Sequence, residues 1–220
     1  MYVEPLFRNR EEAGQRLGDR LARIVDDPDL QVLALPRGGV PVGLQVARIL
    51  NADLDVFLVR KLGVPGHEEL AMGAIASGGV RVLNHDLIAR LGIPPAVVER
   101  VAASEQVEIT RRERLYRGHR PQPILRGRTV ILVDDGLATG ATMTAAARAV
   151  QLHEPKRTIA AVPVGAEDAC DSLREHVDEV ICLATPEPFY AVGLWYEDFS
   201  PTTDYEVRDV LERATREHVP

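Results

Sequence analysis

Two adjacent carboxylates followed by a turn of small residues form the pattern with the clearest chemistry in this sequence of 220 residues. Asp134 and Asp135 come directly after the run 129–133, whose β-branched and aliphatic residues are typical of a strand buried on both faces. A turn spans 136–141, and a helix through 143–150 follows it. Acids at the carboxyl end of such a strand lie where open α/β sheets bind ligands. The alternative interpretation is a strand, a turn and a helix with surface acids and no ligand.

The turn is suited to hold a phosphate group. Its residues around the anion would be Thr139, Gly140, Ala141 and Thr142. Backbone N–H groups at a helix N-terminus have no partner within the helix, and the helix dipole is positive there. The glycine lets the backbone come close, and the threonines add hydroxyl donors. Because the neighbouring acids can accept hydrogen bonds from hydroxyls, the two features together indicate a sugar phosphate.

A second turn of this kind follows the first expected core strand, 31–35. Its residues are Pro36, Arg37, Gly38 and Gly39, and a helix through 42–50 comes next. Two glycines allow close approach to an anion, and the arginine supplies a fixed charge with forked donors. A plain strand-to-helix turn is the alternative.

Adjacent cations end the next expected strand, 54–59. Arg60 and Lys61 would therefore face the same ligand edge, although a surface pair is the alternative. The segment 62–69 that follows is polar and rich in turn residues, which predicts a mobile loop. Its His67, Glu68 and Glu69 are candidates for proton handling, and free solvation of the loop tip is the alternative.

The stretch from Val130 to Met143 resembles the binding motif for phosphoribosyl diphosphate (PRPP) in the type I phosphoribosyltransferases. That motif is a hydrophobic run, two acids and a Thr-Gly turn. The resemblance implies that Asp134 and Asp135 bind the ribose hydroxyls as catalytic residues, and that 138–142 bind the 5-phosphate. It also implies that 36–39 bind pyrophosphate, in a loop that often holds a cis peptide in the family. Arg60 and Lys61 resemble a catalytic pair that reaches the pyrophosphate just before a flexible catalytic loop.

The activity implied by this resemblance is transfer of the 5-phosphoribosyl group between PRPP and a nitrogenous base, with pyrophosphate as the leaving group. The cofactor implied is Mg²⁺, held largely by PRPP with Asp134 and Asp135 as its contacts in the chain. Many 6-oxopurine enzymes of the family place an aspartate directly before the Thr-Gly. This sequence has Ala138 there, as adenine and uracil enzymes do, so the base stays open. The proton-transfer group would come from Glu68, Glu69 or the later acids Glu197 and Asp198.

Aromatic residues are concentrated near the C-terminus. Five of the chain's ten lie in 185–199. A planar base stacks on aromatic rings, at about 1–3 kcal/mol per base in nucleic-acid complexes. The family holds its base under a hood built partly from this part of the chain, and the resemblance favours Phe189 and Trp195 as the stacking residues. A satellite aromatic cluster beneath a loop is the alternative.

The alternation of strands and helices predicts an α/β fold: a doubly wound, mostly parallel sheet with helices on both faces. We expect a single domain over 1–220, with a core at about 31–183. A small hood at about 184–200, with contributions from the N-terminus, and a C-terminal helix at about 204–218 complete it. A hairpin at 71–83 and a long helix from Pro95 to about Arg117 interrupt the alternation.

Composition narrows the classes of partner. The net charge of −7 argues against a general nucleic-acid binder. Five arginines at the end of the long helix could instead form an RNA or phosphate patch, or simply a solvated face; they are Arg111, Arg112, Arg114, Arg117 and Arg120. No apolar run is long enough to span a membrane, and the first ten residues have no secretory h-region. Two cysteines without metal-ligand spacing fit buried thiols in a cytoplasmic protein.

Three functions remain open at this point. The first is a PRPP-dependent transferase with PRPP and a base as small-molecule substrates. The second is a PRPP-binding regulator without catalysis, using the arginine patch on nucleic acid. The third keeps the phosphate site for another phosphosugar or nucleotide, as a hydrolase or phosphorylase. Dimers are common in the family, so the resemblance leaves a homodimer open.

Overall fold

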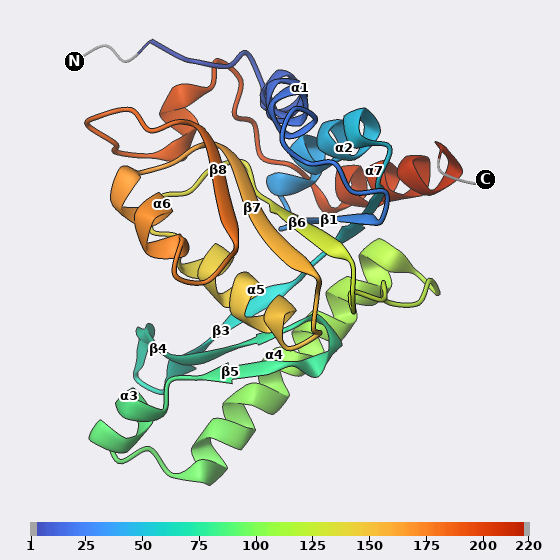
Figure 1. Cartoon of the computed structure of the whole chain (residues 1–220). Helices are drawn as coiled ribbons and strands as arrows, with labels where there is room; N and C mark the ends of the chain where they lie inside the picture. The colour runs from blue at the N-terminus through green and yellow to red at the C-terminus, as the bar shows by residue number, and fades with distance from the viewer. Residues whose placement is uncertain (1–3, 218–220) are drawn as a thin grey trace.

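A five-stranded parallel sheet forms the centre of the computed structural model, which describes residues 4–217 (Figure 1). In spatial order the strands are β2 (Asp53–Val56), β1 (Leu30–Ala34), β6 (Thr129–Val133), β7 (Arg157–Val164) and β8 (Glu179–Ala184). Every neighbouring pair in this sheet is parallel. All residues of β1 and β6 are buried, as expected of strands covered on both faces.

Helices cover both faces of this sheet. Helices α1 (Arg10–Leu21) and α2 (Gly39–Leu50) pack on one face, against Val32, Ile131 and Ile159. Helices α5 (Ala141–Gln151) and α6 (Glu167–Leu173) pack on the other, in a cluster with Leu33 and Leu132. The expected doubly wound parallel sheet is therefore confirmed.

The chain changes direction between β1 and β6, and this change creates the ligand edge. From β1 it passes through α2 to β2 at one side of the sheet, whereas from β6 it passes through α5 and α6 to β7 and β8 at the other. The loops that leave the carboxyl ends of β1 and β6 therefore diverge over opposite faces. Open α/β sheets bind ligands in the crevice at such a switch point. Residues 36–39 and 134–142 both begin there.

A second, antiparallel sheet lies against the outer side of α5. It consists of β3 (Val59–Val64), β4 (His67–Ala76) and β5 (Arg81–Leu83), with the 3₁₀ turn η1 (Ser77–Gly79) between the last two. Its alternating side chains pack on α5 from one face and on α4 (Pro95–Arg117) from the other. The short helix α3 (His85–Arg90) follows β5. The expected hairpin at 71–83 is confirmed.

The expected mobile loop at 62–69 is wrong in its secondary structure. β3 continues to Val64 and β4 begins at His67, so the segment is the tip of a β-hairpin whose turn holds Gly66 at φ 83°. The polar composition reflects exposure at this tip, because 65–70 all lie on the surface. The local structure follows from the alternation of side chains between the two faces of the strands, and not from the polar composition of the segment.

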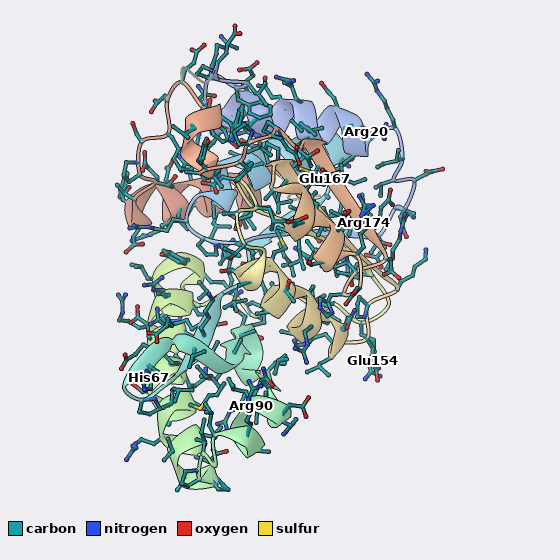
Figure 2. All side chains as sticks on the ribbon, turned by 90° about the vertical axis from the view of Figure 1, so that its left-hand side faces the viewer. Arg20, His67, Arg90, Glu154, Glu167 and Arg174 are labelled. Carbon is teal, nitrogen blue, oxygen red and sulfur yellow. The ribbon has the colours of Figure 1, made fainter. Side chains whose placement is uncertain are left out.

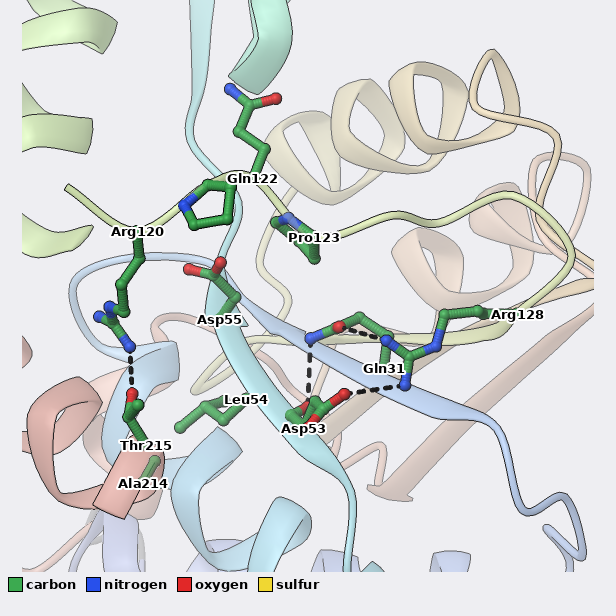
Figure 3. A pocket seen from close by; sticks show the side chains of 11 residues that line it. Gln31, Asp53, Leu54, Asp55, Arg120, Gln122, Pro123, Arg128, Ala214 and Thr215 are labelled. Carbon is green, nitrogen blue, oxygen red and sulfur yellow. Dashed lines mark hydrogen bonds and ion pairs between the residues drawn. The ribbon is translucent and has the colours of Figure 1, made fainter. Parts of the chain in front are cut away.

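Charged side chains join the strands at the opposite, amino end of the sheet (Figure 3). Arg128 donates to Gln31 Oε1 at 2.9 Å and to Asp53 Oδ2 at 2.9 Å, so one guanidinium ties the starts of β1, β2 and β6. Arg120 bonds to Thr215 and to the Leu211 carbonyl on the last helix. These groups line a cavity of about 320 Å³. Their bonds to one another indicate a structural clamp.

The C-terminal region returns to the carboxyl edge. The 3₁₀ turn η2 (Val192–Trp195) lies within 184–200, and α7 (Asp204–Glu217) follows. The last residue of the expected helix at 204–218 falls outside the described part of the chain. Val207, Val210 and Leu211 of α7 pack against α2, β2 and α4. None of the helices described has the length and apolar character needed to cross a membrane.

Candidate functional site

The two acids and the glycine loop are in direct contact at the switch point. Asp134 and Asp135 follow β6, and the Asp134 carboxylate accepts a hydrogen bond from the Asp135 N–H at 2.8 Å. A Cβ atom added to Gly39 would lie 2.9 Å from Asp134 Cα, and one added to Gly38 would lie 2.6 Å from Asp135 Cγ. The structure therefore brings together the acids and the loop 36–39, which are almost a hundred residues apart in the sequence.

Replacing Gly38 by alanine should disrupt this contact. The backbone there has φ −62° and ψ −32°, which alanine adopts freely, so the new methyl group is the only local conflict. Overpacking of this kind costs about 1–3 kcal/mol, or several degrees in the melting temperature of a protein of this size. We expect that loss in a thermal melt, together with weaker PRPP binding. The same alanine introduced beside Asp135→Ala should melt no lower than Asp135→Ala alone; an equal loss in both backgrounds would contradict the contact.

Burial dominates the electrostatics of the acid pair. Removal from water raises the pKa of Asp134 well above its usual value, and the neighbouring Asp135 charge raises it further. Burial also raises the pKa of Asp135, although a hydrogen bond from Arg10 partly opposes the shift. Two acids of elevated pKa beside a ligand crevice are typical of a functional site.

Arg10 is a site residue that the sequence did not reveal. It is the first residue of α1, which Asn9 caps by accepting a hydrogen bond from the Glu12 N–H. The Arg10 guanidinium donates to Asp135 Oδ2 at 2.8 Å and to the Ser200 carbonyl at 2.8 Å, and it lies 3.8 Å above the Phe199 ring centroid. Both partners of the ion pair are close to nine-tenths buried. No local pattern near Arg10 indicates this, because its partner is 125 residues away.

The phosphate turn is open to a ligand. Gly140 has φ 73°, a conformation suited to glycine, and it directly precedes α5. Within the described residues, the N–H groups of 138–140, 142 and 143 donate no hydrogen bond. Ala141 donates only a long bond, of 3.5 Å, to the Thr139 hydroxyl. Free amides at the start of an eleven-residue helix form an anion-binding site.

Arg37, the second residue of the loop 36–39, is half-exposed. The Pro36–Arg37 peptide bond is cis. The Arg37 guanidinium lies 3.8 Å from the Asp204 carboxylate at the start of α7, and Asp204 also accepts a hydrogen bond of 2.5 Å from the Tyr116 hydroxyl. Burial, together with this bond, raises the pKa of Tyr116 to about 12. Asp204 and Tyr116 were not expected from the sequence, since α7 and α4 meet here only through the fold.

The structure places Arg60 and Lys61 on different faces of β3, and their action as a catalytic pair stays a prediction. They lie within β3, beyond the last residue of β2, and consecutive side chains of a strand point to opposite faces. Arg60 forms an ion pair with Glu105 of α4. Lys61 faces α5 and lines a cavity of about 380 Å³ with Thr144 and Arg148. The two cations therefore lie on different surfaces, Arg60 toward α4 and Lys61 toward α5.

The candidates for proton handling at 67–69 lie at the start of β4, and Glu69 lines a cavity with Lys61 and with Ala141 of the phosphate turn. Figure 2 shows His67 at the tip of the antiparallel hairpin, well apart from Glu167 of α6. His67 lies near Glu69, and Glu68 accepts a bond from the Gly66 N–H, so the acids of this tip interact within it.

The aromatic segment forms a cover over the acids. The Tyr196 hydroxyl donates to the Asp135 carbonyl at 2.6 Å, and a Cβ on Gly136 would meet Val192 Cγ2 at 2.8 Å. Leu6 and Phe7 donate to the Trp195 carbonyl, so the N-terminal segment contributes to the cover.

The two expected stacking residues have different exposure. The Phe189 and Trp195 rings stack on each other, with centroids 6.3 Å apart. Trp195 is 8% exposed and belongs to a buried cluster with Phe7 and Tyr196, which matches the alternative of a satellite aromatic cluster. Phe189 is half-buried and lines a cavity.

The arginines at the end of α4 are mostly engaged within the protein. Arg117 is buried against Asp55, Arg111 and Arg112 bond to Glu108, and Arg120 bonds to backbone carbonyls. These internal bonds favour the solvated or structural interpretation over an RNA patch.

A magnesium ion fits only together with a phosphorylated ligand. In the part of the chain that is described, no three His, Cys, Asp or Glu side chains gather into a metal site. Asp134 and Asp135 supply oxygen ligands, and Mg²⁺ typically uses one or two carboxylates with substrate phosphates and water. The donor set therefore fits an ion carried mainly by its substrate.

Comparison with known proteins places the chain in a family. The model of the phosphoribosyl transferase domain matches residues 66–193, which include the acids and the phosphate turn. The crystal structure of TT1426 from Thermus thermophilus is 42% identical and has a TM-score of 0.86. That alignment covers 94% of this chain and 98% of TT1426.

Two further proteins resemble this chain over different shares of their length and at different levels of identity. A protein of Mycobacterium tuberculosis H37Rv, provisionally named phosphoribosyl transferase Rv0571c, is 45% identical over 96% of this chain. The chain spans only 48% of that relative, about half its length. A Neisseria gonorrhoeae protein solved with bound ppGpp shares the fold at 12% identity, with a TM-score of 0.52 and coverage of 97% of this chain and 98% of that one. The chain belongs to the phosphoribosyl transferase domain family.

Proposed function

We propose that the protein transfers the 5-phosphoribosyl group between PRPP and a nitrogenous base, with pyrophosphate as the leaving group. One observation carries the proposal: the acid pair and the open phosphate turn of β6 meet the Arg37 loop of β1 at the switch point. A sugar phosphate with a second anionic group on C1 is the ligand whose charges and hydroxyls match these three parts.

Each part has a distinct role in binding. The backbone amides of 138–142 hold the 5-phosphate, assisted by the hydroxyls of Thr139 and Thr142. Asp134 and Asp135 accept hydrogen bonds from the ribose hydroxyls; a carboxylate offers about four acceptor positions, so Asp135 can keep its bond to Arg10. The loop 36–39 and Arg37 hold the pyrophosphate.

The reaction is a displacement at C1 of the ribose. The acceptor nitrogen forms a bond to C1, and the C1–O bond to pyrophosphate breaks with its electron pair leaving on oxygen. The acceptor N–H proton passes to water. Arg37 stabilises the negative charge that develops on the leaving group, and such electrostatic stabilisation is usually the largest catalytic contribution. Mg²⁺, when bound with PRPP next to Asp134 and Asp135, supplies further charge stabilisation.

The decisive test incubates the protein with PRPP, Mg²⁺ and a panel of bases. The expected result is pyrophosphate release that depends on both PRPP and a base. Saturable PRPP binding with no release would instead favour a regulatory PRPP-binding protein. Turnover of another phosphosugar or nucleotide, with none of PRPP, would favour a hydrolase or phosphorylase.

A further inference from the structure

Two free thiols meet beside Gly165, at the carboxyl end of β7. Cys170 is buried in α6, and Cys182 lies in the edge strand β8 (Figure 1). A Cβ atom added to Gly165 would lie 2.9 Å from Cys170 Sγ and 3.4 Å from Cys182 Sγ. Two sulfur atoms from different elements therefore lie close to one point, which the glycine leaves free for them.

The two thiols interact with each other. The Cys182 S–H donates to the Ala184 carbonyl at 3.1 Å, and the Cys170 sulfur is a second acceptor within its reach. A hydrogen bond from Cys182 lowers the pKa of Cys170, while burial opposes this shift. The same contact, together with burial, raises the pKa of Cys182. The pair therefore favours a thiolate on Cys170 with a protonated thiol beside it, and the thiolate is the reactive form of cysteine.

The thiol pair borders the phosphate turn in two places. The Cβ atom added to Gly165 would also lie 3.1 Å from the Cβ atom of Leu137, which directly precedes the turn. On α6 the residue before Cys170 is Ala169, and a Cβ atom added to Gly140 of the turn would lie 3.6 Å from Ala169 Cβ. Closely packed interiors transmit displacements between such neighbours. A change in the position of Cys170 therefore reaches the amides of the turn.

We propose that Cys170 and Cys182 are an oxidation site: a peroxide converts them to a disulfide, and this bond weakens phosphate binding at the turn. A disulfide bond is about 2 Å long, so its formation draws α6 toward β8 from the non-bonded contact of the two sulfurs. The amides of the turn are arranged for an anion in the reduced protein, and the displacement of α6 disturbs that arrangement. The disulfide itself is independent of the proposed function, whereas its effect on phosphate binding rests on that function.

The oxidation is balanced with hydrogen peroxide as the two-electron oxidant. The Cys170 thiolate attacks one peroxide oxygen, the O–O bond breaks, and the departing hydroxide takes up a proton to become water. The Cys182 sulfur then attacks the sulfur of the resulting sulfenic acid, so that the S–S bond forms and the S–O bond breaks. The second hydroxide leaves as water with the proton of the Cys182 thiol. The oxidant approaches from the side of Cys182, because that residue is partly exposed whereas Cys170 is 2% exposed.

Thiol counting tests the disulfide without any ligand. The folded protein is treated with hydrogen peroxide, denatured, and reacted with N-ethylmaleimide before its intact mass is measured. The reduced protein should take up two maleimides, one for each of its two cysteines, and the oxidised protein none. Treatment with dithiothreitol should restore both thiols. Peptide mapping should place the bond within one chain, between Cys170 and Cys182.

Ribose 5-phosphate is the probe for the effect on the turn. Calorimetric titration should give an affinity lower by about fivefold or more for the oxidised protein than for the reduced protein, with recovery after dithiothreitol. Cys182→Ser keeps a donor for the Ala184 carbonyl but cannot form the disulfide, so its affinity should survive the same peroxide treatment. Cys170→Ala, which places a small apolar side chain at the buried position, should behave in the same way.

Three outcomes would count against parts of this proposal. Thiols that both still react with maleimide after peroxide, or that pair only between chains, would overturn the oxidation site. A disulfide that leaves the affinity for ribose 5-phosphate unchanged, or a loss of affinity that Cys182→Ser shares, would overturn its link to the turn. A disulfide in a protein that binds ribose 5-phosphate in neither form would keep the oxidation site and overturn the proposed phosphate site.

Discussion

Replacing Asp134 and Asp135 together by asparagine is expected to weaken PRPP binding by about a hundredfold or more while the protein stays folded. Each carboxylate loses charge-assisted hydrogen bonds to a ribose hydroxyl, and bonds to charged groups contribute about 1.5–3 kcal/mol each. Asparagine keeps the shape, and its oxygen can still accept the Asp135 N–H bond now made by Asp134. Calorimetric titration with PRPP and Mg²⁺ measures the loss, with Asp86→Asn as an exposed control on α3.

The double substitution is expected to weaken PRPP binding, whereas Asp134→Asn alone is expected to raise the stability of the folded protein. Burial raises the pKa of Asp134, so the folded protein bears a cost that grows as the pH rises above the ordinary value of 3.8 and is complete once the pH exceeds the elevated pKa. Below the ordinary value of 3.8 both folded and unfolded states are protonated and the cost is absent. The variant should therefore melt higher than the wild type near neutral pH and equally at acidic pH. Lower stability at neutral pH would show that Asp134 is a structural residue.

Replacing Arg10 by methionine is expected to cost about 3 kcal/mol of stability, because removing one partner of a buried ion pair leaves the other uncompensated. That corresponds to roughly 6–12 °C in melting temperature for a chain of this length. Arg10 lowers the pKa of Asp135, so its removal raises that pKa. PRPP binding should then begin to fail at a higher pH than in the wild type, and should recover as the pH is raised.

Arg16 provides the matched control on the same helix. Its guanidinium lies over the Phe7 ring and donates to the Leu6 carbonyl, without contact to a carboxylate of the site. Arg16→Met should lower stability without moving the pH dependence of PRPP binding. If Arg10→Met and Arg16→Met gave the same pH profile, Arg10 would be only a packing residue.

The sequence predicted those parts of the site that are formed by a few consecutive residues. The acids and the turn at 138–142 follow one strand, and the loop 36–39 follows another, so apolar runs and glycines were enough to locate them. Their meeting also followed from the sequence, since parallel strands share a carboxyl edge.

The parts that the sequence missed depend on which face or which distant segment a side chain meets. Arg60 and Lys61 are adjacent in the chain but point to opposite faces of β3, toward α4 and α5. Arg10 meets Asp135 across 125 residues, and Asp204 meets Arg37 across most of the chain. Local propensity contains no information about such pairs, because packing between elements sets them.

The two ends of the described chain each hold one charge of the crevice, Arg10 on Asp135 and Asp204 near Arg37. A shortened form limited to 31–183 would keep the parallel sheet except for the first residue of β1 and the last of β8, yet it would lose both counterions and the apolar face of α7. Minimal fragments for crystallography or ligand screening should therefore retain α1 and α7. Affinity tags are best separated from either helix by a flexible spacer.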